Sequence, residues 1–124
     1  MKVLLVDDYP DALEALSIYL GAMGFEVQTA EDGLEGLERA QVSVPDVIVL
    51  DLQMPGLSGF EFATALKHDA RTDGIPLIAL SGHSRAAEQR EIAAVFASVL
   101  SKPCEPDHLI SEIHRVARSS GDST

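Results

Sequence analysis

The sequence predicts a single α/β domain built on a five-stranded parallel sheet with helices on both faces. Short apolar runs alternate with longer amphipathic segments along the chain, and this alternation is typical of consecutive β-α units. The apolar runs, such as Val3–Val6 and Val47–Leu50, contain no polar residue, as expected for strands that are covered on both faces. We therefore expect a doubly wound (βα)5 architecture.

Residues that start or stop regular structure bound each element. The expected strands are Lys2–Val6, Phe25–Ala30, Asp46–Leu50, Ile75–Leu80 and Ala97–Ser101. The expected helices are Pro10–Met23, a segment from Asp32 to the residue before Pro45, Phe60–His68, Arg85–Val95 and Pro106–Arg118. Gly24 is a natural stop for the first helix, and Pro45 ends the second. The proline and glycines of Met54–Gly59 indicate a loop.

Apolar residues at helical spacing predict which helix faces pack on the sheet. The expected buried face of the first helix consists of Leu13, Leu16, Tyr19, Leu20 and Met23. That of the second helix consists of Leu34, Leu37 and Ala40, and that of the last helix of Leu109, Ile110, Ile113 and Val116.

The composition fits one domain rather than two. A chain of 124 residues can bury a core without disulfides or a structural metal. Its single cysteine excludes a disulfide framework and a cysteine-based zinc site. No aliphatic run approaches the roughly 20 residues of a membrane-spanning helix. We expect a cytoplasmic domain over residues 1–118 with a frayed polar tail over 119–124.

The net charge narrows the class of partner. The chain has 20 acidic residues against 9 lysines and arginines, which gives a net charge of −11. Binding to nucleic acid or to an anionic membrane is disfavoured, because phosphate binding requires a basic patch and the basic residues are scattered. A cation or a basic protein surface is the better expectation.

Polar side chains stand at the ends of four of the five predicted strands. They are Asp7 and Asp8 after the first strand, Asp51 after the third, Ser81 after the fourth and Lys102 after the fifth. Open α/β sheets bind ligands at the carboxyl ends of the strands, where the strand order reverses. If the first and third strands are neighbours there, the three carboxylates converge, with the hydroxyl and the ammonium group alongside.

Three converging carboxylates need a cation or raised pKa values. Two unit charges about 4 Å apart repel by about 4 kcal/mol at an effective dielectric constant of about 20. Oxygen ligands favour Mg²⁺, with Mn²⁺ and Ca²⁺ as alternatives, and the lysine and hydroxyl suit a phosphoryl group. A carboxylate can itself attack phosphorus. Asp51 is the best placed for this, with Asp7 and Asp8 holding the metal, but residue chemistry leaves the choice among the three open.

At these residues the sequence resembles the receiver domain of bacterial response regulators, the CheY-like family of two-component signalling. The matching segments read KVLLVDD at 2–8, VIVLDLQMPGLSGFE at 47–61, PLIALSG at 76–82 and LSKP at 100–103. The resemblance covers nearly the whole chain, from Lys2 to Arg118. It implies a flavodoxin-like fold with the strand order 2-1-3-4-5.

The resemblance also implies roles for the polar residues. Asp51 would take a phosphoryl group from a phosphohistidine on a sensor histidine kinase or a histidine phosphotransfer protein. Lys102 would pair with the phosphoryl oxygens, and Ser81 would move to donate a hydrogen bond to them. The Lys102–Pro103 peptide bond would be cis, which is uncommon even before proline.

The metal site implied by the resemblance uses both side-chain and main-chain oxygens. Asp7, Asp8, the Asp51 side chain and the main-chain carbonyl of Gln53 would arrange Mg²⁺. Gln53 and His83 occupy variable positions, two residues after the phosphoacceptor and the switch hydroxyl. In the family such positions influence how long the phosphoryl group survives, so we expect substitutions there to change dephosphorylation without abolishing phosphorylation.

The output of the family passes through protein–protein contacts. The fourth helix, fifth strand and fifth helix, here about Ser84–Arg118, would form the contact face for a downstream protein. The fifth-strand position that often carries a switching aromatic residue is Val99, and the usual alanine-glycine pair before that strand reads Ala94-Val95. The chain resembles both single-domain regulators and the receivers of hybrid histidine kinases.

Three other functions are alternatives for this set of residues. An aspartyl-phosphate hydrolase needs an acid two residues after its nucleophile, and Gln53 cannot transfer that proton. A flavin or nucleotide carrier needs a glycine-rich phosphate loop after the first strand, but Asp8–Asp11 is acidic and contains no glycine. A degenerate receiver that only binds proteins is kept as an alternative because the switching aromatic is missing.

Each singled-out residue also has a purely structural alternative. The Asp7-Asp8 pair is able to cap the following helix, and Ser81 the next one. Lys102 has the alternative of a solvated surface lysine. We expect Cys104 to pack as a small apolar group rather than to react.

Overall fold

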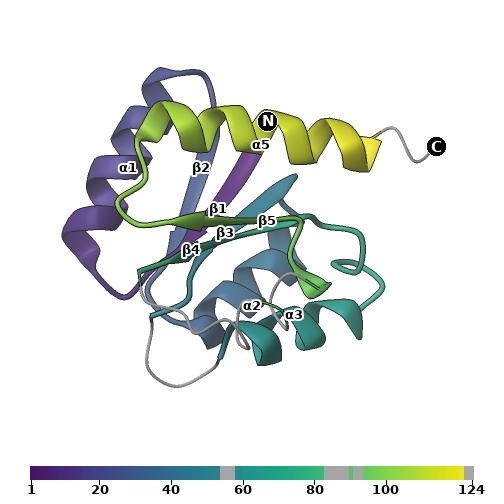
Figure 1. The fold of residues 1–124 in the computed structure, drawn as a ribbon. Helices are drawn as coiled ribbons and strands as arrows, with labels where there is room; N and C mark the ends of the chain where they lie inside the picture. The colour runs from purple at the N-terminus through teal and green to yellow at the C-terminus, as the bar shows by residue number, and fades with distance from the viewer. Residues whose placement is uncertain (54–57, 83–89, 91–93, 122–124) are drawn as a thin grey trace.

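The computed structural model describes residues 1–53, 58–82, 90 and 94–121. Five parallel strands form one sheet in the order β2-β1-β3-β4-β5, which confirms the expected fold class and strand order (Figure 1). The strands are β1 Lys2–Val6, β2 Glu26–Ala30, β3 Val47–Asp51, β4 Leu77–Ser81 and β5 Ser98–Ser101. Each overlaps an expected strand.

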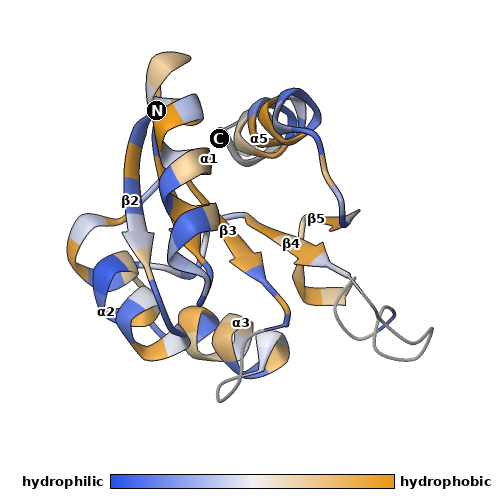
Figure 2. Ribbon diagram, turned by 90° about the vertical axis from the view of Figure 1, so that its left-hand side faces the viewer, coloured by the Kyte–Doolittle hydropathy of each residue, from blue (hydrophilic) through white to orange (hydrophobic). Residues whose placement is uncertain are grey.

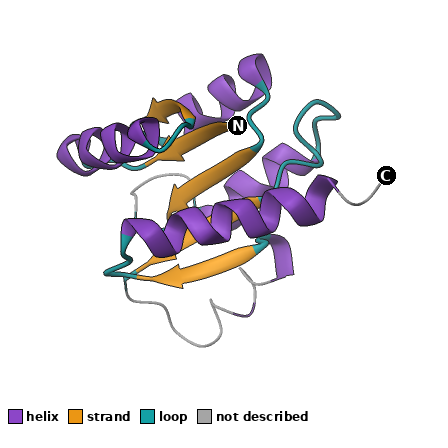
Figure 3. Cartoon of the chain, turned by 90° about the horizontal axis from the view of Figure 1, so that it is seen from above, coloured by secondary structure: helices purple, strands orange, loops and turns teal. Residues whose placement is uncertain are grey.

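Helices cover both faces of the sheet. The described helices are α1 Pro10–Ala22, α2 Gly33–Ser43, α3 Gly59–Lys67 and α5 Pro106–Gly121. Helices α1 and α5 lie on one face, and α2 and α3 lie on the other (Figure 1). Seen from the side of α1 and α5, the C-terminal helix runs over the strands (Figure 3). The helix expected over Arg85–Val95 and the loop expected over Met54–Gly59 lie largely outside the described residues.

Alternate residues of a strand face two different cores. In β1, Val3 and Leu5 belong to the core beneath α1 and α5. Leu4 and Val6 belong to the core beneath α2 and α3. All four are at most 2% exposed. Strands β3 and β4 are hydrophobic along most of their length, whereas β2 carries several polar residues (Figure 2). Burial on both faces is the reason that the central strands β1, β3 and β4 form nearly unbroken apolar runs in the sequence.

The buried face of α1 is narrower than the sequence predicts. Leu13 and Leu20 are buried, but Tyr19 and Met23 are 37% and 56% exposed. The Tyr19 hydroxyl donates a hydrogen bond to the carboxylate of Asp107 at the start of α5, so this ring bridges two helices near the surface. Met23 follows the last helical residue as the C-terminal cap, which takes it off the buried face.

Helix α2 approaches the sheet through glycine rather than through leucine. Leu34, expected on the buried face, is 69% exposed, whereas Gly36 is buried. A Cβ atom at position 36 would lie 3.0 Å from Cγ2 of Val6 and 3.1 Å from Cε2 of Phe62. The helix therefore packs too closely on the sheet for a larger side chain there.

Helices α2 and α3 each begin with a side-chain cap. The Asp32 carboxylate accepts a hydrogen bond from the Glu35 main-chain N–H at 2.8 Å, which agrees with the expected start of α2. The Ser58 hydroxyl oxygen accepts one from the Glu61 main-chain N–H at 3.1 Å at the start of α3. Such caps satisfy N–H groups that have no partner within the helix.

The last helix is longer than expected. Helix α5 continues to Gly121, past the expected end at Arg118, so the division into residues 1–118 and a tail of 119–124 stays a prediction. Among the described residues, no helix combines the length and the apolar character needed to cross a membrane.

We expect Gly36→Ala to destabilise the domain and Gly21→Ala to stabilise it. Val6 and Phe62 are each 1% exposed, so each can give way only against other buried atoms. We therefore expect overpacking of about 1–3 kcal/mol to outweigh a helix-propensity gain of about 1 kcal/mol. A Cβ atom at Gly21 meets nothing within 4 Å, so only the gain applies. Urea unfolding of both variants measures the two changes. A Gly36→Ala protein more stable than the parent would contradict close packing of α2.

Candidate functional site

The carboxyl ends of the parallel strands bring the predicted polar residues to one edge of the sheet. Asp7 directly follows β1, Asp51 is the last residue of β3, and Ser81 is the last residue of β4. Lys102 directly follows β5, and its main-chain N–H donates a hydrogen bond to the Ser81 carbonyl at 2.8 Å. Asp51 and Ser81 thus lie inside their strands rather than after them, and regular backbone hydrogen bonding fixes their positions.

Three carboxylates converge at this edge, as the sequence predicts. One oxygen from each of Asp7, Asp8 and Asp51 lies within 4.8 Å of the oxygens from the other two. Asp51 is only 5% exposed, Asp7 is half-buried, and Asp8 is exposed to solvent. The cluster is therefore deepest at Asp51 and open to water at Asp8.

A lysine partly balances the negative charge. The Lys102 Nζ atom lies 2.9 Å from Oδ2 of Asp51, and the lysine side chain is 32% exposed. The structural alternative of a solvated surface lysine is therefore wrong. The Lys102–Pro103 peptide bond is cis, as predicted.

The other oxygen of the buried aspartate is also held. Oδ1 of Asp51 accepts a hydrogen bond from the Gln53 main-chain N–H at 2.9 Å. The carboxylate thus has one oxygen oriented by the chain that follows β3 and the other oriented by the chain that follows β5. Holding both oxygens fixes the orientation of the carboxyl plane.

The carboxyl group of Asp7 has a pKa above its ordinary value. Burial is the main cause that raises the pKa of its carboxyl above the ordinary value, and the neighbouring Asp51 carboxylate raises it further. The hydrogen bond from the Tyr9 main-chain N–H, at 3.0 Å, and the Lys102 charge act in the opposite direction. The raised pKa therefore follows first from burial of the Asp7 carboxyl and second from the nearby Asp51 carboxylate.

The donor set fits a hard divalent cation. Carboxylate oxygens are the ligands that Mg²⁺ prefers, and Mg²⁺ usually keeps several waters, for which the exposed side at Asp8 leaves room. Asp7, Asp8 and Asp51 are thus placed to hold such an ion. The expected contribution of the Gln53 carbonyl stays a prediction.

The structural alternatives for the acidic pair and for the serine have different outcomes. The N-cap of α1 is Tyr9, and no side chain caps this helix, so Asp7 and Asp8 are not capping residues. Ser81 is 6% exposed. The helix that Ser81 would cap in the structural alternative lies largely outside the described residues. Val99 packs against the core beneath α2 and α3.

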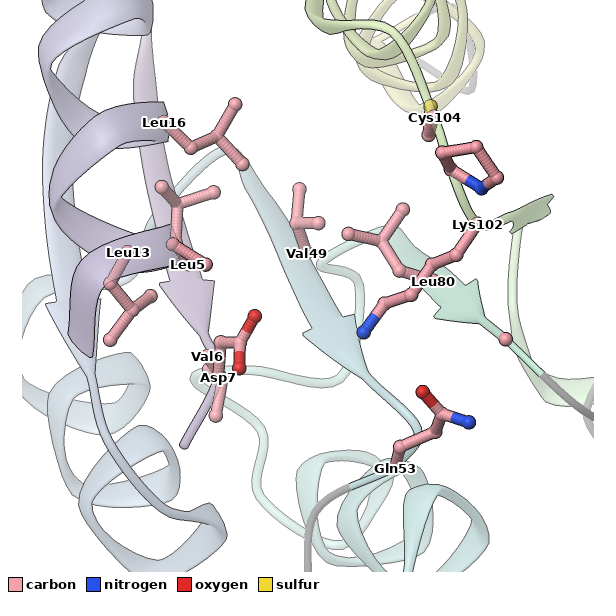
Figure 4. A pocket seen from close by; sticks show the side chains of 13 residues that line it. Leu5, Val6, Asp7, Leu13, Leu16, Val49, Gln53, Leu80, Lys102 and Cys104 are labelled. Atoms are coloured by element: carbon pink, nitrogen blue, oxygen red, sulfur yellow. The ribbon is translucent and has the colours of Figure 1, made fainter. Parts of the chain in front are cut away.

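A cavity of about 620 Å³ opens beside the carboxylates. Figure 4 shows Asp7, Lys102 and Gln53 around one part of it. The remaining wall is largely apolar, formed by residues of α1, the strands and the segment after β5, which include Leu13, Leu16, Leu80 and Cys104. Sequence reasoning assigned these residues to the core and missed the cavity. The helical spacing of Leu13 and Leu16 does not show how far α1 lies from the segment that follows β5.

Cys104 behaves as a packing residue in this wall. It is half-buried and packs against the core beneath α1 and α5. Burial raises the pKa of its thiol, and the charges of Glu105 and Glu112 raise it further. Because the reactive form of cysteine is the thiolate, these surroundings favour the expected packing role over reaction.

We expect Asp7→Asn to stabilise the metal-free protein increasingly as pH rises. The Asp7 pKa is raised above its ordinary value of 3.8 on folding, so the folded chain keeps this proton longer than the unfolded chain. The contribution of Asp7 to the free energy of unfolding therefore falls as pH rises from about 3.8 through the folded pKa. Urea titrations of both proteins in a chelator, across this pH range, measure the difference. A difference that does not change with pH would contradict the raised pKa.

Comparisons with known proteins agree with the fold and the site. The family model for the response regulator receiver domain matches residues 3–114. The chain is 33% identical over 119 residues to Protein PilH of Pseudomonas aeruginosa, covering 93% of this chain and 96% of PilH. It is 37% identical over 125 residues to transcriptional regulatory protein PrrA of Mycobacterium tuberculosis, covering 98% of this chain but only 52% of PrrA.

Solved structures show the same architecture. The chemotaxis protein CheY4 of Vibrio cholerae matches with a TM-score of 0.86 and 36% identity, over 93% of this chain and 97% of CheY4. The receiver domain of a signal transduction histidine kinase from Syntrophus aciditrophicus matches with a TM-score of 0.84 and 25% identity, over 95% of this chain and 90% of that domain. The chain therefore belongs to the response regulator receiver domain family of two-component signalling.

Proposed function

We propose that Asp51 accepts a phosphoryl group from a phosphohistidine on a histidine kinase or histidine phosphotransfer protein, in a reaction that requires Mg²⁺. The observation that carries this proposal is the environment of one carboxylate. Asp51 is buried at the end of β3, its Oδ2 lies 2.9 Å from Lys102 Nζ, and two further carboxylates stand within 4.8 Å. A cavity opens beside them for the donor.

The transfer forms one bond and breaks one. A carboxylate oxygen of Asp51 attacks phosphorus while the bond from phosphorus to the donor imidazole nitrogen breaks, and that nitrogen keeps the electron pair. The Lys102 ammonium group beside Oδ2 is placed to pair with the phosphoryl oxygens as they arrive. The Gln53 N–H keeps Oδ1 in place, so that Oδ2 faces the donor.

Mg²⁺ held by Asp7, Asp8, Asp51 and the Gln53 carbonyl would supply positive charge for the phosphoryl oxygens. Before the ion binds, the three carboxylates repel one another. Asp7 relieves part of this repulsion by holding a proton at a higher pH than an ordinary aspartate does. Because metal binding requires the ionised form, protons and Mg²⁺ compete at Asp7.

We propose that the phosphorylated domain acts by changing protein–protein contacts. Ser81, at the end of the strand next to β3, would donate a hydrogen bond to the phosphoryl group and so couple the site to the face formed by β5, α5 and the segment before them. Val99 has no aromatic ring to swing, so this coupling would depend on packing at β5 instead. The chain would serve as a single-domain regulator or as the receiver of a longer protein such as a hybrid histidine kinase.

The two alternative functions have less support. A protein-binding module without chemistry needs no buried aspartate paired to a lysine, and this chain has one. A hydrolase of phosphate esters needs a proton donor near the nucleophile, and the amide of Gln53 cannot serve. Rapid repeated turnover of small phosphate esters would favour the hydrolase.

We expect a small-molecule phosphodonor such as acetyl phosphate to label Asp51 in the presence of Mg²⁺. Mass spectrometry of the intact protein should show one phosphoryl group per chain, stable in acid and lost in base, as an acyl phosphate is. Asp51→Asn should remove the label, and Lys102→Ala should reduce it, because the phosphoryl oxygens lose their cationic partner. A label that persists in Asp51→Asn, or no label on the parent chain, would refute the assignment of Asp51.

We expect Mg²⁺ to raise the melting temperature by relieving the carboxylate repulsion. A ligand at about 100 times its Kd stabilises the folded state by about 2.7 kcal/mol. Asp8→Ala should lose much of this gain, whereas Asp73→Ala, which removes an exposed carboxylate outside the cluster, should keep it. Thermal unfolding with and without Mg²⁺ measures both variants. Equal gains in the two variants would mean that the ion binds elsewhere.

A further inference from the structure

The side-chain amide of Gln53 lies against Gly82. A Cβ atom at position 82 would stand 2.7 Å from Oε1, 2.8 Å from Nε2 and 3.0 Å from Cδ of Gln53. Real Cβ atoms essentially never come this close to another heavy atom, so the amide occupies space that any larger residue at position 82 would take. The absence of a side chain at Gly82 is what permits this position of Gln53.

The backbone at Gly82 does not itself require glycine. Its φ lies outside the left-handed region, in contrast to the φ of +98° at Gly24. An alanine is therefore compatible with the local conformation. The atoms that it would meet belong to the far end of a flexible, exposed side chain, so the amide can move away without disturbing the core. Substitution at Gly82 should thus displace Gln53 and leave the fold intact.

The amide also borders the cavity that opens beside the carboxylates. Gln53 and Gly82 line the same cavity as Asp7 and Lys102, and Figure 4 shows the Gln53 amide on the side where Lys102 ends. The Gln53 main chain is anchored to Asp51 by the hydrogen bond to Oδ1. The base of this side chain is therefore fixed at the site, and Gly82 decides where its tip lies.

We propose that Gly82 is a positioning residue that lets the Gln53 amide cover the phosphoryl group on Asp51 and slow its hydrolysis. This inference depends on the proposed function. In hydrolysis a water oxygen bonds to phosphorus, the bond between phosphorus and the Asp51 oxygen breaks, and the carboxylate keeps the electron pair. The protons of water pass to solvent and to the released phosphate. A neutral amide cannot take them, so Gln53 acts by occupying the space through which water approaches.

The test is a double-mutant cycle on the lifetime of the phosphorylated protein. The parent chain, Gly82→Ala, Gln53→Ala and the double variant are loaded with acetyl phosphate and Mg²⁺. The donor is then removed and the loss of phosphate is followed by mass spectrometry. We expect each single variant to shorten the half-life several-fold. The double variant should decay at the rate of Gln53→Ala, because Gly82 acts only through that side chain.

Controls separate positioning from other effects. Gly21→Ala, a glycine substitution in open space on α1, should leave the half-life unchanged, and circular dichroism of each variant checks folding. An unchanged or longer half-life in Gly82→Ala would overturn the inference. The inference would also be overturned if Gly82→Ala shortened the half-life equally in the parent chain and in Gln53→Ala. The added methyl group would then act directly and not through Gln53. If the parent chain takes no phosphoryl group, the proposed function itself fails, which is a different result.

Discussion

The mutual repulsion of carboxylates at one end of the sheet is the constraint on which the site depends. Asp51 is only 5% exposed, and Asp7 and Asp8 bring two more carboxylate oxygens within 4.8 Å. Such an arrangement is costly without positive charge. Lys102 supplies one positive charge at 2.9 Å from Asp51, while burial and the Asp51 charge both raise the pKa of Asp7. The site is thus built to gain from a divalent cation and from a group that brings its own oxygens to that cation.

The remainder of the fold holds these charges together. The three central strands β1, β3 and β4 are buried on both faces and contribute residues to two cores. Burial of this extent offsets the electrostatic cost at the strand ends, since each large apolar side chain removed from water contributes about 1.5–3 kcal/mol. Close packing of α2 through Gly36 belongs to the same arrangement. The carboxylates therefore cannot separate without disturbing strands that are anchored along their whole length.

The surroundings of Asp51 suit transfer of a phosphoryl group better than its repeated hydrolysis. A cavity with an apolar wall gives a donor room beside the buried carboxylate, while the neutral amide of Gln53 stands against Gly82 at the same cavity. Neither the apolar wall of the cavity nor the neutral Gln53 amide is able to activate water by removing its proton. The chain spans 96% of PilH but about half of PrrA, so similar domains occur both with and without further segments. A phosphoryl group that stays on the domain and is recognised through protein–protein contacts is compatible with both arrangements.

The sequence alone determined the fold class, the strand positions and the residues at the strand ends, because strands buried on both faces leave continuous apolar runs and because the family motifs lie at those ends. Convergence of Asp7, Asp8 and Asp51 was predictable only together with the strand order that the resemblance implied. The tertiary structure decided what depends on distances between elements. Helical spacing placed Leu34 on the buried face, yet the close approach of α2 buries Gly36 instead. Neither the cavity nor the contact between the Gln53 amide and Gly82 is encoded in any local pattern, since each depends on how far apart separate segments come to rest.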